Sequence, residues 1–464
     1  MLEFQEDFFE PEIRNGFFVD ATMKSMWAAD MEVLARISAV CEKYNIQWYA
    51  AYGTLLGAIR HEGFVPWDDD MDIWVMRKGY NKLMEVLPKE LPEGYVVQSC
   101  MTDVGYDQFH TCVNNGSGVS IRAEWLKEYH GCPFTVAVDI FPLDYLPRDS
   151  GQEEILMKLL EMTGRAAQLA KNIGHGQYEG VQRENAFREM MEAKEYIEDF
   201  CSYRFNEEFL EQENWRMISA DFWKCANTIA MIYNEEDADY IVDFMDYDRF
   251  GKKHKKEWFQ EAYIADFECV MLPVPCGYDD VLKTIYGNYM VPVKNWDGHE
   301  YPFYARQLRE LRRIVKEKEQ AADPTGEHRK PEPQKVFPAN WEEMIEGKKV
   351  VLFEDGIPLY TEYGESAIQK LEEVLQTFKD NRDKIVLWWR PQQQIRTALG
   401  LVSQELVEHY DRIVQSYLEE GWGIYDISLE EDRAIEKSCA YYGEQNATVN
   451  KIKGKMPIMI EAIV

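Results

Sequence analysis

The chain has 464 residues, of which 46% are hydrophobic and 13% aromatic, so we expect two or three globular domains rather than a disordered chain. Its formal net charge of -32 argues against nucleic acid as a partner, because phosphate backbones are bound by basic surfaces. The nine cysteines are scattered and form no CxxC pair, which indicates neither a disulfide framework nor a zinc knuckle.

The N-terminal stretch MLEFQEDFFEPEIRNGFF lacks the basic and apolar regions of a signal peptide, and no apolar run approaches the roughly 18 residues of a membrane span. We therefore expect a cytoplasmic protein with at most peripheral association with the inner face of a membrane. Between residues 20 and 44, apolar residues recur at helical spacing, which predicts a helix with Asp20 or Thr22 as its N-cap.

The next segment, IQWYAAYGTLLGAIR, predicts a strand that ends at Gly53 and a short helix from Leu55 to Arg60. Glycine allows a phosphate to approach the backbone, the Thr54 hydroxyl can donate a hydrogen bond, and a helix N-terminus favours an anion. Arg60 could hold a phosphate through two hydrogen bonds. Gly53, Thr54 and Arg60 are thus candidate substrate-binding residues.

The stretch RHEGFVPWDDDMDIWV places four aspartates among bulky apolar residues. In a strand MDIWVM, alternation puts Asp70 and Asp72 on one face, about 7 Å apart. Burying both as ions would cost several kcal/mol unless a cation compensated them. Hard oxygen ligands in a partly wet cleft select Mg²⁺ or Mn²⁺.

An acidic turn that caps the following helix would also account for Asp68 and Asp69, and we expect Asp69 to be solvated. An EF-hand is disfavoured, because DDDMDIWVMRKG lacks the glycine at its sixth position and the glutamate at its twelfth. A third strand, TVAVDIFPLDYL, carries Asp139 in similar apolar surroundings. Three converging carboxylates are typical of metal-assisted phosphoryl transfer.

Beyond this strand the pattern changes along the chain. Residues 151–259 show a helical period, which predicts a mainly helical insert, and residues 316–340 are charged and proline-rich, as expected of a linker. Residues 341–464 alternate between strand and helix patterns with short links, which predicts a Rossmann-like α/β domain with a parallel sheet.

The motif GTLLGAIRHEGFVPWDDDMDIWV resembles the LicD family, which includes bacterial phosphocholine transferases and fukutin-type proteins. VDIFPLD and LKTIYGNYMVPV continue the resemblance over roughly residues 20–310. It implies an α+β, nucleotidyltransferase-like catalytic domain at residues 1–315 that binds Mg²⁺ or Mn²⁺.

Carried over residue by residue, the resemblance makes Asp70, Asp72 and Asp139 the catalytic carboxylates, with Asp139 also a candidate base toward the acceptor hydroxyl. Asp68 supports them, so the implied metal set is Asp68, Asp70, Asp72 and Asp139. The resemblance also implies a closing loop with Tyr286, Gly287 and His299, although a core or surface role explains His299 equally well.

LicD-type enzymes move phosphocholine from CDP-choline to a sugar hydroxyl of teichoic acid or another glycan and release CMP. The expected partners are therefore a CDP-alcohol donor, CDP-choline first, and a glycan or lipid-linked glycan acceptor. Ribitol or glycerol could replace choline in the donor. Two alternatives remain: nucleotidyl transfer with release of pyrophosphate, and a non-catalytic glycan- or nucleotide-binding protein.

A choline head group is held by cation–π contacts, for which Trp67, Trp74, Trp125 and Tyr52 are candidates, Trp67 being counted with the substrate-binding residues. In the C-terminal part, VLWWRPQ, GWGIYD and AYYGEQNATVNKIKGKMPIMI resemble one lobe of GT-B and glycerophosphotransferase-like enzymes. Gln392 stands where a histidine is usual, and residues 444–447 replace a Gly-Asp-Ser-Ser type of turn. We therefore expect this lobe to be a binding or docking module.

Overall fold

The computed structural model describes residues 1–103, 105–293, 304–322, 338, 340–428, 431–444 and 446–460. The chain divides into two compact units, one of Met1–Gln5 with Ser25–Val293 and one of Glu6–Lys24 with Lys294–Val464. The first unit therefore differs from the domain predicted at residues 1–315, because residues 6–24 and the segment from residue 294 onward belong to the second unit. Among the helices that the structure describes, none combines the length and the apolar character needed to cross a membrane.

A mixed sheet forms the centre of the first unit. Its strands lie in the order β3 (Trp48–Ala50), β4 (Met71–Met76), β7 (Ala137–Pro147), β6 (Thr111–Asn114) and β5 (Val96–Gln98). β4 and β7 are parallel, whereas β3, β6 and β5 join their neighbours antiparallel. Strand β8 (Ala238–Val242) pairs with the far end of β7, and β9 (His254–Lys255) pairs with β8. The predicted mixture of helices and strands is confirmed for this unit.

Helices connect these strands. They are α1 (Ala21–Lys43), α2 (Tyr52–His61), α3 (Arg77–Glu90) and α4 (Ala123–Glu128). The predicted helix at residues 20–44 is confirmed by α1. Helix α2 starts three residues before the predicted Leu55, because the Leu55 N–H already donates to the Ala51 carbonyl and Tyr52 turns the chain with a φ of 40°.

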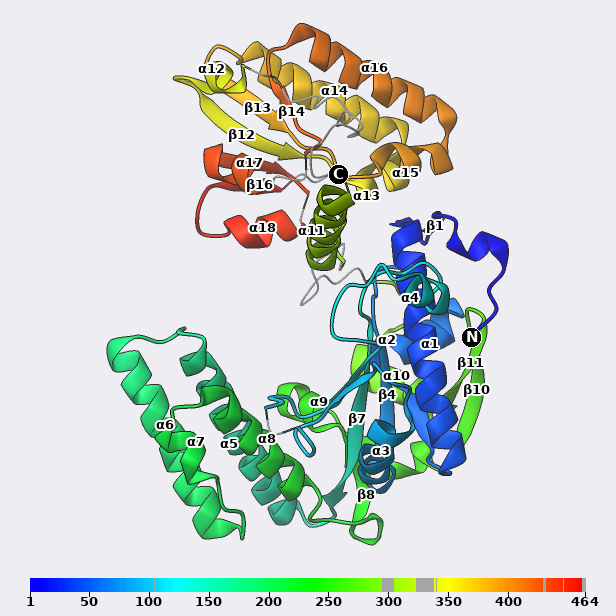
Figure 1. Cartoon of the computed structure of the whole chain (residues 1–464), viewed down its shortest axis with the longest axis vertical. Coiled ribbons are helices and arrows are strands. Elements are labelled where there is room, and N and C mark those ends of the chain that lie inside the picture. The colour runs from blue at the N-terminus through cyan, green and yellow to red at the C-terminus, as the bar shows by residue number, and fades with distance from the viewer. Residues whose placement is uncertain are drawn as a thin grey trace. The chain divides into compact units, whose positions relative to one another are not determined.

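Helices occupy most of the predicted insert at residues 151–259. Helices α5 (Ser150–Gly174), α6 (Gly180–Phe200), α7 (Glu207–Glu211) and α8 (Trp215–Ala230) form one group in Figure 1. They share a core of small and apolar side chains, among them Ala166, Ala170 and Met190. After α8 the chain returns to the sheet through β8, α9 (Phe244–Phe250), β9 and the turn η3 (Lys256–Phe259). The part of the predicted insert after residue 237 thus contains the short strands β8 and β9 beside α9.

A hairpin of β10 (Ala262–Phe267) and β11 (Val270–Pro275) follows, and then helix α10 (Tyr278–Tyr286). The hairpin turn holds the segment that leads to the acidic motif. The Glu268 N–H donates to the Glu62 carbonyl at 2.8 Å, and the Glu268 carboxylate accepts the Phe64 N–H at 3.1 Å. This contact fixes where the chain enters residues 65–70.

The second unit contains a parallel sheet with both faces covered. Its strand order is β14 (Ile424–Tyr425), β13 (Ile385–Trp389), β12 (Lys349–Glu354), β15 (Ala440–Gly443) and β16 (Ile458–Ile460). One apolar core joins the sheet to α13 (Ile357–Tyr363), α14 (Glu365–Asp380), α15 (Ile395–Val402) and α16 (Gln404–Glu420). The other joins it to α12 (Trp341–Ile345), α17 (Glu431–Lys437) and α18 (Ala447–Ile452). The predicted separate parallel sheet is confirmed.

Two short segments complete the second unit. The turn η1 (Glu6–Phe9) and the strands β1 (Glu12–Arg14) and β2 (Phe17–Val19) come from the N-terminal residues, and Phe18 packs into the core of α13 and α14. Helix α11 (Ala305–Ala322) extends into the predicted linker, so residues 316–322 are helical rather than irregular. Good helix formers and the Arg313–Glu317 ion pair one turn apart favour this continuation.

Candidate active site

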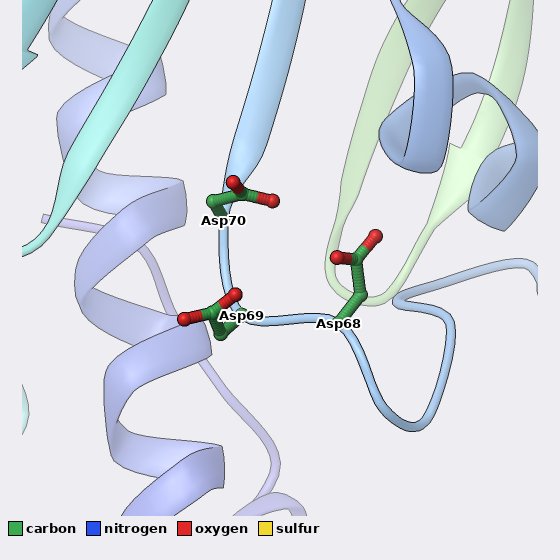
Figure 2. A group of neighbouring side chains, drawn as sticks. All are labelled: Asp68, Asp69 and Asp70. Carbon is green, nitrogen blue, oxygen red and sulfur yellow. The ribbon is translucent and has the colours of Figure 1, made fainter. Parts of the chain in front are cut away.

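Three successive aspartates line the loop that leads into β4. Figure 2 shows Asp68, Asp69 and Asp70 along this loop, with Asp70 next to the start of the strand. One carboxylate oxygen from each lies within 4.8 Å of the others, a spacing at which a single ion could be held. The expectation of a solvated Asp69 thus differs from the structure, which brings Asp69 into the group and leaves it partly buried.

Asp72 and Asp139 stand side by side on the two parallel strands at the centre of the sheet. They are partners in the β4–β7 register, so their side chains project from the same face. The pKa of Asp72 is raised well above its ordinary range by burial and by the charges of Asp70 and Asp139. Among the described residues, no lysine or arginine forms an ion pair with Asp72. The structure thus places Asp72 beside Asp139 and groups Asp70 with Asp68 and Asp69, and the predicted convergence of Asp70, Asp72 and Asp139 on one ion stays a prediction.

His110, the residue before β6, contacts Asp139 from the neighbouring strand. Its Nε2 lies 3.4 Å from Asp139 Oδ2, and its ring packs on Phe141 with centroids 4.8 Å apart. The other oxygen, Asp139 Oδ1, is buried and has no hydrogen-bond partner among the described residues. Sequence reasoning missed His110, because a single histidine before a four-residue strand gives no spacing signal.

Gly53 and Thr54 lie in the first turn of α2, directly behind the acidic loop. A Cβ on Gly53 would come within 2.1 Å of Asp68 Oδ2, so the absence of a side chain makes room for that carboxylate. Thr54 is only 3% exposed, and its hydroxyl accepts the Asp72 N–H at 2.8 Å. Thr54 therefore supports Asp72 here, which differs from the predicted phosphate contact because protein atoms cover its hydroxyl.

Arg60 lies at the end of α2, and two of its three side-chain nitrogens already donate hydrogen bonds to protein atoms. Its Nη1 donates to the Tyr289 carbonyl at 2.6 Å, and its Nε donates to His61 Nε2 at 2.8 Å. Burial lowers the pKa of Arg60. Nη2 has no hydrogen bond among the described residues, so Arg60 could offer its two N–H groups to a ligand, and the predicted two-point contact with a phosphate stays a prediction.

The segment after α10 approaches the same site. Tyr286 is 41% exposed, yet the pKa of its hydroxyl is raised by desolvation and then by the charges of Asp68 and Asp72. Gly287 follows with a φ of 65°, a left-handed conformation that glycine adopts easily. His299 lies outside the described residues.

Asp243, at the N-terminus of α9, is hydrogen-bonded to side chains of α2 and β4, the two elements that flank the acidic loop. The sequence analysis did not identify it. It is 1% exposed and accepts hydrogen bonds from the Tyr52 hydroxyl at 2.7 Å and from Trp74 Nε1 at 3.2 Å. Burial raises the pKa of Asp243 to about 6. Because Tyr52 has a positive φ, this hydrogen bond holds the strained start of α2 in place.

The predicted aromatic cage is mostly core. Trp74 is fully buried and bonded to Asp243, and Trp125 is 9% exposed with its Nε1 donating to the Cys132 carbonyl. Tyr52 is tied to Asp243, with its ring 5.0 Å from that of Trp74. Trp67 is half-buried and precedes Asp68 in the acidic loop, so it remains a candidate for contact with the head group.

The donor set fits a hard divalent cation. All the candidate ligands are carboxylate oxygens, the ligand type that Mg²⁺ and Mn²⁺ prefer. The buried and unpartnered Asp139 Oδ1, together with the uncompensated Asp72, indicates a site where positive charge is needed. A phosphate-bearing substrate could then approach an otherwise strongly acidic surface.

Comparisons with known proteins agree with this location. Residues 45–149 match the family model described as LicD/FKTN/FKRP, nucleotidyltransferase domain. The lipopolysaccharide cholinephosphotransferase LicD of Haemophilus influenzae is 24% identical over 274 residues, which cover 58% of this chain and 91% of the relative. An uncharacterised protein of Rickettsia prowazekii is 46% identical over 55 residues, and one of Rickettsia typhi is 41% identical over 56 residues. These two matches cover 12% of this chain and 21% and 18% of the relatives. The resemblance predicted from the sequence is confirmed for residues 45–149, and the likeness of the C-terminal part to a GT-B lobe stays a prediction.

Proposed function

We propose that this chain, which carries a LicD-family domain at residues 45–149, is a phosphotransferase that moves phosphocholine or a related alcohol phosphate from a CDP-alcohol to a glycan hydroxyl. The relative from Haemophilus influenzae is named as a lipopolysaccharide cholinephosphotransferase, which supports choline as the head group and a cell-surface glycan as the acceptor. The observation that carries the proposal is the group of carboxylates around Asp72, whose own pKa is raised well above its ordinary range by burial and by the charges of Asp70 and Asp139. The mixed sheet is then that of a nucleotidyltransferase-like fold.

In this reaction the acceptor hydroxyl attacks the phosphorus that carries the alcohol. A phosphorus–oxygen bond to the acceptor forms, and the bond from that phosphorus to the bridging oxygen of the diphosphate breaks. The electron pair stays on the bridging oxygen, which leaves with CMP. The acceptor loses its proton, for which the proposal assigns Asp139 as the base, with His110 Nε2 at 3.4 Å as its neighbour.

The other residues of the site bind and orient. Asp68, Asp70, Asp72 and Asp139 would hold Mg²⁺ or Mn²⁺, which when bound neutralises the charge that develops on the diphosphate oxygens. Thr54 fixes the Asp72 backbone through its hydroxyl. The proposal assigns the Nη2 of Arg60, which makes no hydrogen bond within the described residues, to a phosphate group of the donor.

The decisive experiment is product analysis with purified protein. CDP-choline, CDP-glycerol and CDP-ribitol are each incubated with lipopolysaccharide or teichoic acid, with Mn²⁺ or with a chelator. We expect CMP to be released and the alcohol phosphate to appear in the acceptor, only when the metal is present. Asp72→Asn should lower turnover by about 100-fold or more, because a carboxylate ligand is lost.

Asp383→Asn is the matched control, since it removes the same charge at an exposed position of the second unit. Release of pyrophosphate with a nucleotidylated product would instead establish nucleotidyl transfer. Binding without metal-dependent turnover of any of the three donors would contradict the proposal and favour a non-catalytic glycan- or nucleotide-binding protein.

A further inference from the structure

The two strands beyond Asp139 continue the row of side chains to which the central carboxylates belong. Cys112 of β6 is the register partner of Asp139, and Gln98 of β5 is the register partner of Cys112. Register partners project from the same face of a sheet, so these three residues and Asp72, the partner of Asp139 on β4, form one row. Two strand spacings, about 10 Å, separate Gln98 from Asp139. The row therefore extends from the acidic site across the rest of the sheet.

The face that carries this row is less covered than the opposite face. In β6 and in residues 137–141 of β7, the side chains that project to the side of Asp139 are half-buried. Those that project to the other side include Val113, Val138 and Ile140, and each of these is 0% exposed. A ligand that reaches the carboxylates can therefore also contact the side chains of β6 and β5 in the same row.

Two amide side chains lie together at the far end of the row. Asn114 lies two residues after Cys112 in β6 and so projects from the same face. Its Nδ2 donates to Gln98 Oε1 at 3.4 Å and to Cys112 Sγ at 3.3 Å. Asn114 Oδ1 and Gln98 Nε2 make no hydrogen bond within the described residues. The pair thus offers one acceptor and one donor group, and a hydroxyl group can use both because it is itself donor and acceptor.

The absence of charge in β5 and β6 indicates the kind of ligand. None of the seven residues of these two strands is charged, although 29% of the residues of the chain are. β5 ends the order of the sheet, and natural proteins commonly place charged side chains on such an edge. An ordinary solvent-facing edge therefore does not explain the two amides. An anionic group bound there would be repelled by Asp72 and Asp139, so the chemistry suits a neutral sugar or polyol.

We propose that Gln98 and Asn114 form the acceptor subsite, where they bind hydroxyl groups of a neutral sugar or polyol. The inference rests on the proposed function, in which Asp139 is the base toward the acceptor hydroxyl. Asp72 and the acidic loop lie on the β4 side of Asp139, where they hold the donor diphosphate through the cation. The acceptor then approaches from the other side, along β6 and β5. The two amides select the glycan and do not contact the donor.

Gln98→Met and Asn114→Leu test the subsite, because each keeps the size of the side chain and removes its hydrogen bonds. Steady-state kinetics use the full-length chain with the metal, CDP-alcohol and acceptor that the wild type turns over. Each variant should raise the KM for the acceptor about 3- to 10-fold, the effect of one neutral hydrogen bond, with kcat and the KM for the CDP-alcohol unchanged. Calorimetric titration with the delipidated, dephosphorylated oligosaccharide of lipopolysaccharide, without donor, should show the same loss of affinity.

Gln182→Met is the matched control, since it makes the same replacement at an exposed position of α6, and it should behave as the wild type. A raised KM for the CDP-alcohol with an unchanged KM for the acceptor would overturn the subsite and assign the amides to the donor. Wild-type affinity for the oligosaccharide in both variants, or no binding of it by the wild type, would also overturn the subsite. Melting temperatures show whether each variant folds, and if one does not, the other decides.

The two proposals fail separately. Product analysis with the wild type decides the proposed function, because it needs neither variant. The oligosaccharide titration decides the subsite, because it needs no turnover.

Discussion

At the scale of single residues, the site depends on how closely the acidic loop approaches α2. Gly53 faces Asp68 Oδ2 so tightly that a Cβ would lie 2.1 Å from that oxygen, well inside contact distance. Gly53 has no positive φ, so alanine suits its helical backbone and should not unfold the chain. The consequence of a side chain at this position is therefore displacement of a carboxylate rather than loss of the fold.

We expect Gly53→Ala to weaken Mn²⁺ binding about tenfold or more while the melting temperature of the metal-free chain changes little. Calorimetric titration with Mn²⁺ and a thermal melt without metal are the measurements. Gly118→Ala is the control, because a Cβ there would meet no atom within 4 Å. Unchanged Mn²⁺ affinity in Gly53→Ala would show that Asp68 does not take part in metal binding.

His254 provides a second residue-scale prediction, on stability. It is 1% exposed, and its ring lies 5.8 Å from that of Phe259 and 5.9 Å from that of Trp74. Desolvation, with a smaller effect of Lys252, lowers its pKa to about 4. Between pH 6.5 and 4 the unfolded chain binds a proton that the folded chain excludes, so the free energy of unfolding falls as the pH falls.

The total loss from this histidine is about 3 kcal/mol over that window, and His254→Phe should remove it. Urea unfolding at several pH values between 4 and 7 measures the difference in slope. The exposed His175, replaced by phenylalanine in the same way, should leave the wild-type slope in place. Equal slopes for His254→Phe and the wild type would mean that His254 is protonated in the folded chain.

The sequence locates only some of these residues, for a physical reason. Asp70 and Asp72 are two residues apart in one strand pattern, and Asp139 lies in a second strand with a similar apolar alternation. Local spacing alone is therefore enough to predict these three as site residues. Asp243 lies at the start of a helix distant in the sequence and meets Tyr52 and Trp74 only through tertiary packing, so no local spacing indicates it.

At the scale of elements, long periodic segments were predictable and short ones were not. The helix α1 and the strands β4, β7 and β12 follow clear apolar patterns. β5 and β6 have three and four residues, too few for a period to be recognised. β8 was not predicted and lies within the range of the predicted helical insert. Its five residues are too few to show a strand pattern, and it forms a strand because it pairs with β7.

The helical insert is held to the sheet by a buried charged contact. Arg77 at the start of α3 donates to both oxygens of Asp144 on β7, at 2.6 and 2.7 Å, and to Asn227 Oδ1 on α8 at 2.9 Å. The two charged residues are 6% and 3% exposed, and Asn227 is fully buried. Removing one charge leaves the other buried without a partner, which is the costly case.

We expect Arg77→Leu to destabilise the unit by about 3–5 kcal/mol, and the double variant Arg77→Leu/Asp144→Leu to be less destabilised than that single variant. Chemical unfolding of the two single variants and the double variant gives the coupling energy. Arg165→Leu, which breaks the exposed pair with Glu189, should cost less than about 1 kcal/mol. Additive losses in the double variant would show that Arg77 and Asp144 contribute independently.

At the scale of the whole molecule, the two units have separate apolar cores and different relations to the acidic site. The candidate ligands, between residues 68 and 139, belong to the first unit, whereas the parallel sheet and its two helical layers belong to the second. A cation that binds only the folded first unit stabilises that unit by mass action. Units with separate cores need not unfold in a single step.

Scanning calorimetry of the full chain should therefore resolve two transitions, of which Mn²⁺ raises one. Leu83→Ala, in the core of the first unit, should lower the Mn²⁺-sensitive transition, and Leu371→Ala, in a core of the second unit, should lower the other. Each replacement removes a buried leucine, at a cost of about 2–5 kcal/mol, so the two variants serve as controls for each other. A single transition that Mn²⁺ shifts as a whole, and that both variants lower alike, would show that the chain unfolds as one cooperative body. The acidic site would then be coupled to the stability of the parallel sheet, and Mn²⁺ binding would have to be analysed for the whole molecule.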